Sequence, residues 1–335
     1  MIIIRKLPSN RVFKNIVIAT LILTFVLSSS ETAMAKTKKV SKKPKGHIIL
    51  VQKYPKTIYA TEHFRFKPKL KVKVKKGKYR YGKVKFSYSS SNKKVATVNR
   101  KGVVTGTGAG DATITIKSSN GVRRSYQIKV KGIDKLVALT FDDGPSEHTS
   151  RLLDAIKENG FHGTFFMVGC YAQNQPDVLR KMVNYGNEPA IHSWAHADYT
   201  TMSQDAVAAD IESTRNTIMN YTGVSPTLVR PPYGSYNAST LEAFRQKGCS
   251  CIMWNTDIED WKYFNAVTVE NNIMSRVHPG AVLVIHDSHS WSVDAIIAAM
   301  PKLKAQGYEL VTVSQFAKLK GIKLTPGSKF TGTDR

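Results

Sequence analysis

Two patterns of hydrophobic and polar residues divide the chain near residue 133. Between residues 47 and 131, apolar residues alternate with polar ones in short stretches such as 112–116 and 126–130, with Gly-rich turns between them. Alternation with a period of two predicts β-strands that bury one face. About 85 residues of such short strands predict a small all-β sandwich.

From residue 134 onward, strand-like runs alternate with helix-like runs, which is typical of a β/α architecture. Strands are predicted at 136–141, 164–168, 227–230, 249–254 and 281–286. Helices are predicted at 146–159, 203–221 and 292–306, among others. The segment is short for a complete eightfold barrel, so we expect a distorted (β/α) barrel with its chemistry at the carboxyl ends of the strands.

The first 35 residues have the pattern of a secretory leader. Basic residues precede a twelve-residue apolar run at 16–27, and Ala33 and Ala35 supply the small residues of a cleavage site. The run is short for a membrane span of about 20 residues, although a leader of this kind is sometimes retained as an anchor. We predict a cleaved signal peptide, a secreted protein, and no membrane span after the signal is removed.

The net charge of +26 comes from one segment of the chain. Residues 36–133 contain 28 Lys and Arg but two acidic residues, whereas residues 134–322 contain 15 Lys and Arg and 20 acidic residues. The basic stretch at 36–46 is predicted to be an extended linker because like charges repel. The remaining excess either solubilises the strands or binds polyanions. For an exported protein, we expect anionic wall polymers rather than nucleic acid as partners.

The segment 64–75 concentrates this positive charge. Apolar residues alternate there with Arg65 and with lysines from Lys67 to Lys75, and Pro68 interrupts the run. Pro cannot donate a ladder hydrogen bond, so we predict either an edge strand or two successive strands. In an extended strand, the basic side chains would share one face at a spacing of roughly 6.6 Å.

Five polar clusters follow predicted strands in the second half. They are Asp-Asp at 142–143, His-Ser-Trp-Ala-His at 192–196, Arg-Pro-Pro-Tyr-Gly at 230–234, Asp-Ile-Glu-Asp-Trp at 257–261 and His-Asp at 286–287. Two imidazoles four residues apart can bind one divalent ion, as His192 and His196 would do. With a carboxylate such as Asp143, they would leave positions open for water and substrate. Ser193 replaces the Glu of the protease zinc motif, which excludes a metalloprotease of that type.

Two further positions suggest acid–base chemistry. Arg230 follows a predicted strand, and a cation next to paired carboxylates would lower the pKa of one of them. His286 also ends an apolar strand and is followed by an acid. A neighbouring carboxylate would keep such a His protonated, so it is a candidate general acid.

In this order, the five clusters resemble those of the polysaccharide deacetylases (carbohydrate esterase family 4), which are metal-dependent hydrolases of N-acetylated sugars. The resemblance covers about residues 135 to 320 and implies a distorted (β/α) barrel. It also implies that Asp143, His192 and His196 hold a divalent metal, most often zinc.

The resemblance further implies catalytic roles for four residues. Asp142 would be the general base that deprotonates the attacking water, and Arg230 would hold Asp142 in place. His286 would protonate the departing amine, and Asp260 would tune the pKa of His286.

It implies three substrate contacts as well. The backbone N–H of Tyr233 would stabilise the oxyanion together with the metal. Trp261 and Leu283 would line the pocket for the acetyl methyl group.

The first half resembles a second family. The segments 88–98, 102–106 and 110–114 are similar to the bacterial Ig-like group 2 domain, with Tyr88 where that family usually has Trp. The resemblance implies an adhesion or spacer module without catalytic residues.

Together, these predictions divide the chain into a signal peptide at 1–35, a basic linker at 36–46, an Ig-like domain at 47–131, a deacetylase domain at 134–322 and a tail at 323–335. We expect a wall-associated enzyme that removes acetyl groups from N-acetylglucosamine of peptidoglycan. Chitin, another poly-N-acetylglucosamine and acetylxylan are alternative substrates. The alternative from a different functional class, a binding protein rather than an enzyme, is an adhesin that only binds glycans.

Overall fold

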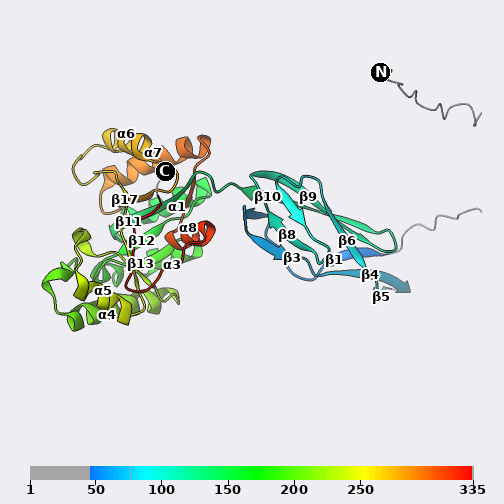
Figure 1. Cartoon of the computed structure of the whole chain (residues 1–335), viewed down its shortest axis with the longest axis horizontal. Helices are drawn as coiled ribbons and strands as arrows, with labels where there is room; N and C mark the ends of the chain where they lie inside the picture. Colours follow the sequence, from blue (N-terminus) through cyan, green and yellow to red (C-terminus); the bar gives the residue numbers. More distant parts are fainter. Residues whose placement is uncertain (1–45, 76, 334–335) are drawn as a thin grey trace, which may run out of the picture. The chain divides into compact units, whose positions relative to one another are not determined.

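The computed structural model describes residues 46–75 and 77–333 (Figure 1). The predicted signal peptide at 1–35 and the predicted linker at 36–46, except Gly46, lie outside the described residues. Within the described ranges, no helix combines the length and the apolar character that crossing a bilayer requires.

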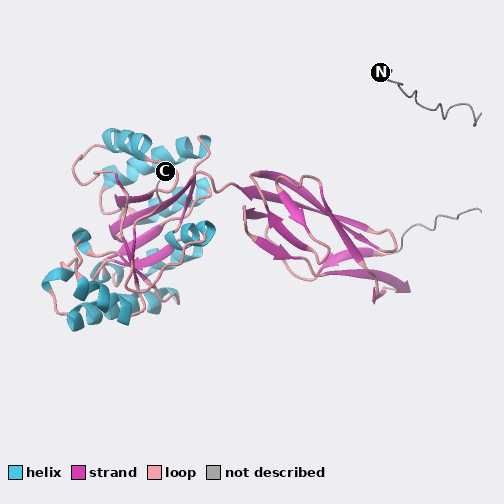
Figure 2. Cartoon of the chain, in the orientation of Figure 1, coloured by secondary structure: helices cyan, strands magenta, loops and turns pink. Residues whose placement is uncertain are grey.

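Among the described residues of the first half, all regular elements are strands (Figure 2). One sheet contains β1 (His47–Leu50), β4 (Pro68–Lys75) and β5 (Lys78–Gly82). A second contains β2 (Thr57–Tyr59), β10 (Arg123–Lys131), β9 (Gly110–Ser118) and β6 (Phe86–Ser90). A third contains β3 (His63–Arg65), β8 (Val103–Gly106) and β7 (Ala96–Val98). All described pairs are antiparallel except β2 with β10.

Alternation along these strands produces the core of the first half. On β9, Ala112, Ile114 and Ile116 are buried, and they share one apolar cluster with Ile128 of β10. Pro68 begins β4, where the first residue of a strand can lack an N–H donor. The run 64–75 therefore forms two successive strands, and the small all-β sandwich is confirmed.

The second half is organised around one parallel sheet. Its strands are β11 (Leu136–Gly144), β12 (Thr164–Met167), β13 (Glu188–Ile191), β14 (Leu228–Val229), β15 (Ser250–Ile252), β16 (Thr256–Asp257), β17 (Val282–His286), β18 (Glu309–Val311) and β19 (Lys329–Phe330). The order is β16-β17-β11-β12-β13-β14-β15-β19, and β18 also pairs with β11. No pairing joins β16 to β19 in the part of the chain that the structure describes. The barrel is therefore open, as the prediction of a distorted (β/α) barrel requires, and a strand from the predicted tail extends it.

Helices surround this sheet. They are α1 (Thr149–Asn159), α2 (Gly169–Ala172), α3 (Pro176–Asn184), α4 (Gln204–Thr222), α5 (Ala238–Gln246), α6 (Ala266–Arg276), α7 (Ser290–Ala305) and α8 (Val313–Lys320). The Ser203 hydroxyl caps α4 by accepting from the Ala206 N–H, and Gly223 ends that helix with a left-handed φ of 73°. Both positions agree closely with the predicted helix at 203–221.

Side-chain parity divides the barrel into an outer and an inner layer. On β11, Val137, Leu139 and Phe141 belong to the large cluster shared with the outer helices. The intervening Leu136 and Ala138 belong to a second cluster, which includes side chains of α8. The inner face is thus packed with apolar groups near the amino ends of the strands. At the carboxyl ends, the same inner parity presents Thr140 and Asp142.

Strand β13 was not among the predicted strands, and Pro189 lies inside it. The backbone N–H groups of Glu188 and His192 donate to β12, whereas the Ile191 carbonyl accepts on the side of β14. Pro189 has the parity of Ile191, and β14 pairs with β13 only at Ile191. The missing N–H of Pro189 therefore faces a position where β14 offers no partner, which is where a strand tolerates Pro.

Candidate active site

The candidate site begins with an irregularity at the end of β11. The register between β11 and β12 shifts between Asp142 and Gly144, and Asp143 has a left-handed φ of 70°. Successive strand side chains normally point to opposite faces, but an extra residue in a bulge can redirect a side chain. Both Asp142 and Asp143 consequently line the same cavity.

Asp143, His192 and His196 form a candidate metal site. Their ligand atoms lie within 4.8 Å of one another. The Oδ1 atom of Asp143 is 3.3 Å from Nε2 of His192 and 3.1 Å from Nε2 of His196. Burial opposes ionisation of Asp143, but the two imidazoles outweigh it and hold the pKa of that carboxyl well below its usual range.

The donor set of this trio fits a divalent cation. Oδ1 of Asp143 is buried, and apart from the two nearby imidazoles it has no hydrogen-bond partner within the described residues. A buried oxygen that is left unsatisfied is costly unless a ligand completes it. Nδ1 of His192 lies 2.7 Å from the backbone carbonyl of Arg230, which leaves Nε2 free to act as a ligand. Two imidazoles and one carboxylate are a typical set for hydrolytic zinc.

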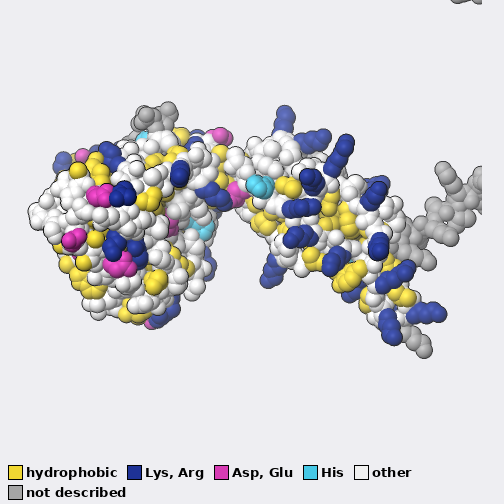
Figure 3. Space-filling view, turned by 60° about the horizontal axis from the view of Figure 1, so that its bottom comes forward, with side chains coloured by type: hydrophobic (Ala, Val, Ile, Leu, Met, Phe, Trp, Pro, Cys, Tyr) yellow, Lys and Arg dark blue, Asp and Glu magenta, His cyan; other side chains and the backbone are white. Residues whose placement is uncertain are grey.

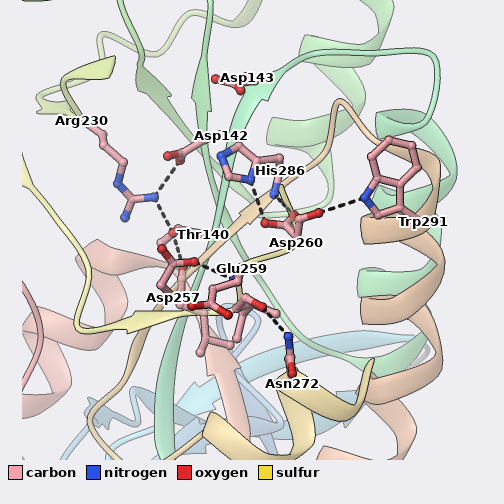
Figure 4. Close-up of polar contacts among 12 residues, drawn as sticks. Thr140, Asp142, Asp143, Arg230, Asp257, Glu259, Asp260, Asn272, His286 and Trp291 are labelled. Atoms are coloured by element: carbon pink, nitrogen blue, oxygen red, sulfur yellow. Dashed lines mark hydrogen bonds and ion pairs between the residues drawn. The ribbon is translucent and has the colours of Figure 1, made fainter. Parts of the chain in front are cut away.

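Arg230 holds Asp142 from beneath the cavity (Figure 4). Its guanidinium is fully buried, and Nη1 donates to Oδ1 of Asp142 and to Oγ1 of Thr140, each at 2.7 Å. Nε and Nη2 donate to the backbone carbonyls of Ile252 and Met253. Buried charges persist when they are paired and fully hydrogen-bonded, so this network fixes Asp142 as a carboxylate facing the cavity.

Asp260 holds His286 on the neighbouring strand. Oδ2 of Asp260 accepts from the backbone N–H of His286, and Oδ1 lies 2.8 Å from ring Nδ1 (Figure 4). Burial disfavours the charged imidazole, but the Asp260 carboxylate outweighs burial and raises the pKa of His286 to about 9. His286 is therefore protonated near pH 7. It pairs in register with Asp142, so a carboxylate and an imidazolium lie at the same level of the sheet.

Helices α6 and α7 fix the loop that carries Asp260. Arg276 donates to the Asp257 carbonyl and to the Glu259 carboxylate. The indole Nε1 of Trp291 donates to the backbone carbonyl of Asp260 at 3.0 Å. These hydrogen bonds fix the conformation of the loop, and because Asp260 binds His286, they also help to position His286.

Backbone strain is concentrated around the site. Six described residues other than Gly have positive φ: Thr61, Asp143, Ser193, His196, Tyr233 and Glu259. All except Thr61 lie at or after the carboxyl ends of the strands that form the candidate site. Such conformations cost about 1–3 kcal/mol each and tend to occur at functional sites.

The cavity has a volume of about 410 Å³. Seven predicted site residues line it: Asp142, Asp143, His192, His196, Tyr233, Trp261 and His286. Arg230 and Asp260 are buried behind it and contact Asp142 and His286. The lining residues Trp254, Asp257 and Val284 were not among the predicted site residues, although Trp254 ended a predicted strand and Asp257 began one of the five clusters.

The structure corrects the prediction for Leu283. Its side chain is fully buried in the outer cluster, and Val284 lines the cavity in its place. Val284 shares the inner parity of His286, two residues later, whereas Leu283 points the opposite way.

Asp287 has a different environment from its neighbour His286. It is buried, its carboxylate accepts from the Thr149 hydroxyl, and its backbone carbonyl accepts from the Ser146 hydroxyl. Burial raises the pKa of Asp287 to about 7. A Cβ at Gly144 would lie 2.3 Å from both carboxylate oxygens of Asp287, so position 144 requires Gly for this close approach.

Comparisons with known proteins agree with this arrangement. A profile of the polysaccharide deacetylase family matches residues 129–252, and a profile of the bacterial Ig-like domain (group 2) matches residues 67–128. A solved structure of the peptidoglycan deacetylase PdaC from Bacillus subtilis aligns with a TM-score of 0.54 and 39% identity. It covers 56% of this chain and 92% of that one.

Two curated relatives carry activities in their names. The peptidoglycan-N-acetylmuramic acid deacetylase PdaC of Bacillus subtilis is 40% identical over 56% of this chain and 39% of its own length. The peptidoglycan-N-acetylglucosamine deacetylase PgdA of Listeria monocytogenes is 36% identical over 59% of this chain and 41% of its own length. The matched region therefore spans about two fifths of each relative.

Proposed function

This chain belongs to the polysaccharide deacetylase family, and from that premise we propose that it is an exported, metal-dependent hydrolase that removes acetyl groups from N-acetylglucosamine of peptidoglycan. The observation that supports the proposal is that three groups suited to hydrolysis face one cavity. A candidate metal trio, a carboxylate paired with a buried Arg and a protonated His all face the same 410 Å³ space. A module that only binds glycans has no use for all three together.

Asp142 is the proposed general base. It is buried, and Arg230 holds one of its oxygens at 2.7 Å. The other oxygen is left to accept a proton from a water molecule in the cavity. Because Arg230 is itself anchored by two backbone carbonyls, the carboxylate stays oriented while it accepts that proton.

His286 is the proposed general acid. Nδ1 is bound to Asp260, so Nε2 is the nitrogen that remains to donate a proton to the departing amine. With a pKa of about 9, His286 carries that proton at neutral pH. The backbone N–H of Tyr233 is proposed to bind the developing oxyanion, and Trp261 with Val284 to enclose the acetyl group.

Asp143, His192 and His196 would hold the divalent ion, for which we propose zinc. When bound, such an ion polarises a carbonyl oxygen and lowers the pKa of a water molecule. The chain would supply the orientation, because the Arg230 carbonyl fixes the ring of His192 and the bulge turns Asp143 toward the cavity.

Names of relatives support peptidoglycan as the substrate, but they differ in the sugar, with N-acetylmuramic acid for PdaC and N-acetylglucosamine for PgdA. We propose N-acetylglucosamine. The leader pattern at 1–35 supports export to the wall, and the basic first half supports retention there by anionic wall polymers. We further propose the boundaries 47–131 and 134–322 for the Ig-like and deacetylase domains.

Mass spectrometry of purified muropeptides, N-acetylglucosamine oligomers and acetylated xylan after incubation with the protein tests this function. We expect N-acetylglucosamine of muropeptides to lose the mass of one acetyl group and to gain one hydrogen, and we expect a chelator to abolish this change and zinc to restore it. Asp142→Asn should abolish it, whereas Asp294→Asn makes the same change at an exposed acid paired with Arg151 and should retain it. Deacetylation of xylan alone would contradict the substrate, and no release from any glycan would favour an adhesin.

A further inference from the structure

One face of the first sheet of the N-terminal half combines cations with tyrosines. We call it the Lys/Tyr face, and it consists of Lys69, Lys71 and Lys73 of β4 with Tyr79 and Tyr81 of β5. Lys and Arg side chains are spread over this half of the chain, where Asp and Glu are scarce (Figure 3). These five side chains are also arranged in a regular way, which distinguishes them from scattered surface charges.

Strand register places the five side chains on one side of the sheet. Lys71 is opposite Tyr81, and Lys73 is opposite Tyr79. Residues directly opposite each other project to the same face. The intervening Leu70 is buried in the core, so the Lys/Tyr face points to solvent, where Tyr79 is 49% and Tyr81 60% exposed.

The tyrosines hold two of the lysines in place. Nζ of Lys71 lies 4.1 Å from the centre of the Tyr79 ring, and Nζ of Lys69 lies 5.1 Å from that of Tyr81. An exposed cation–π contact contributes about 0.5–1 kcal/mol. The ammonium groups are therefore partly ordered before any ligand arrives, which reduces the entropy lost on binding. Along β4, they repeat at roughly 6.6 Å.

Within the described residues, these cations have no carboxylate partner. The acidic residues in 46–133 are Glu62 and Asp111, and neither lies on β1, β4 or β5. No ion pair involves a Lys of the Lys/Tyr face in the part of the chain that the structure describes. Solubility is served by interspersed charges of both signs, whereas a row of one sign creates a field that attracts polyanions.

We propose that the Lys/Tyr face binds a linear polyol-phosphate polymer, with ammonium groups on successive phosphates and tyrosine hydroxyls on the polyol. A row of regularly spaced ammonium groups fits a ligand with regularly spaced monoanions along an extended chain. The repeat length of a short polyol phosphate is comparable to the distance spanned by two residues of a strand. The choice of a wall polymer rests on the proposed function, but the site is separate from the hydrolytic cavity.

Two other polyanionic partners fit less well. Single-stranded nucleic acid binds by stacking bases on aromatic rings, but lysines already cover the rings of Tyr79 and Tyr81. Anionic membranes are bound by surfaces that also insert Trp, Phe or Leu. The Lys/Tyr face contains none of these residues, and all four Trp of the chain lie beyond residue 190.

Binding of the full chain to immobilised poly(glycerol phosphate) across a series of NaCl concentrations tests the proposal. Lys69→Gln/Lys71→Gln/Lys73→Gln should weaken binding by roughly tenfold or more, and should reduce the slope of log affinity against log salt by about 2, at about 0.7 per lost contact. The matched control Lys93→Gln/Lys94→Gln/Lys101→Gln removes three exposed lysines of the same half and should change both quantities little.

Equal loss in the two triple variants, or no binding by the wild type, would overturn the proposal. Tighter binding of single-stranded DNA than of poly(glycerol phosphate) would overturn it as well. Acetate release from soluble N-acetylglucosamine oligomers, measured on the same three proteins, should be unchanged. If the wild type releases no acetate but the Lys/Tyr face binds the polymer, the proposed enzymatic function fails and the binding face stands.

Discussion

Arg230 and Lys71 show how differently the two halves of the chain use a positive charge. Arg230 is fully buried, donates to Asp142 and Thr140, and is anchored by two backbone carbonyls. Lys71 lies on the surface of β4 and contacts only the ring of Tyr79 among the charged and aromatic partners described. The interaction energy of two charges is large in the protein interior, where the dielectric constant is low, so one buried pair can matter by itself. In water each interaction is weak, so exposed charges have a large effect only in combination.

The same contrast extends to the backbone and to the expected response to salt. The loops of the candidate active site contain Asp143, His196 and Tyr233 in left-handed conformations, which packing around them must maintain. Strands β4 and β5 of the Lys/Tyr face contain no described residue of that kind. We therefore expect single substitutions to disable the second half, and only multiple substitutions to disable binding by the first.

The largest effect should come from Asp142→Asn. Amide replacement keeps the shape but removes the proposed proton acceptor, and loss of a general base lowers kcat by about 10²–10⁴-fold. Asp111→Asn makes the same change at an exposed acid of the first half and should leave kcat unchanged. Steady-state acetate release with matched zinc content is the measurement. A retained kcat in Asp142→Asn would assign the base elsewhere.

Breaking the buried pair should have the next largest effect, on stability. Arg230→Met leaves the buried Asp142 carboxylate without a partner, which costs about 3–5 kcal/mol. Lys71→Met removes a surface cation and should change the free energy of unfolding by no more than about 0.5 kcal/mol. All four Trp lie in the second half, so Trp fluorescence during urea denaturation follows that half, and far-UV circular dichroism follows both.

A double substitution separates lost charge from lost packing. Arg230→Met/Asp142→Asn should recover part of the stability lost in Arg230→Met, because no unpaired charge remains buried. If the double variant recovers none of the lost stability, Arg230 acts by filling space between Phe166 and Trp254. Its Cζ atom lies 4.2 Å and 5.5 Å from the centres of these two rings.

The sequence predicted the composition of the site better than its geometry. The clusters at Asp142, Arg230 and His286 were recognisable because each follows an apolar strand and parallel strands end at one edge. The cluster at His192 was recognisable from its spacing to His196. The apolar pattern alone did not decide between Leu283 and Val284, although strand parity with His286 would have favoured Val284. Strand β17 is apolar on both faces, so the alternation that reveals orientation in β9 is absent.

Contacts between distant segments were also beyond the sequence. Asp287 follows His286 directly, but its carboxylate accepts from Thr149 at the start of α1. The carboxylate beside His286 belongs to Asp260, for which only family resemblance gave a reason. The bulge that turns Asp143 toward the cavity depends on pairing with β12, which no local pattern encodes.

A pH profile of kcat tests whether Asp260 is the main partner that keeps His286, the proposed general acid, protonated at neutral pH. His286 has a pKa raised to about 9, so the wild type should lose kcat only as pH rises through about 9. Asp260→Asn removes the carboxylate that raises the pKa of His286 most; burial, which lowers this pKa, remains, as do Asp142 and Asp143, which raise it less. The alkaline limb of the variant should therefore move down from about 9 toward about 6.5, the ordinary pKa of His.

The same pKa has a consequence for stability. Because it is higher in the folded chain than in the unfolded one, the stabilisation by Asp260 should be complete below pH 6.5 and lost as pH rises through about 9. Urea denaturation of wild type and Asp260→Asn at pH 6 and pH 10 measures it. A stability difference that grows with pH would contradict the assignment.

The smallest effect should distinguish two lysines within the Lys/Tyr face. Neighbouring ammonium groups spaced about 6.6 Å apart repel by about 0.6 kcal/mol at the dielectric constant of water before salt screening. Lys73→Gln relieves this repulsion, and no cation–π contact of Lys73 is found among the described residues. Lys71→Gln relieves it too but loses the contact with Tyr79, which offsets the gain.

We therefore expect Lys73→Gln to stabilise the first half slightly more than Lys71→Gln at low salt, and the benefit of both to decline in 1 M NaCl, where the Debye length is about 3 Å. Hydrogen exchange of β4 and β5 amides measures the opening free energy of that sheet alone. If both substitutions instead destabilise the sheet equally at every salt concentration, these lysines are held by specific partners as Arg230 is, and the contrast between the two halves fails at its weakest interaction.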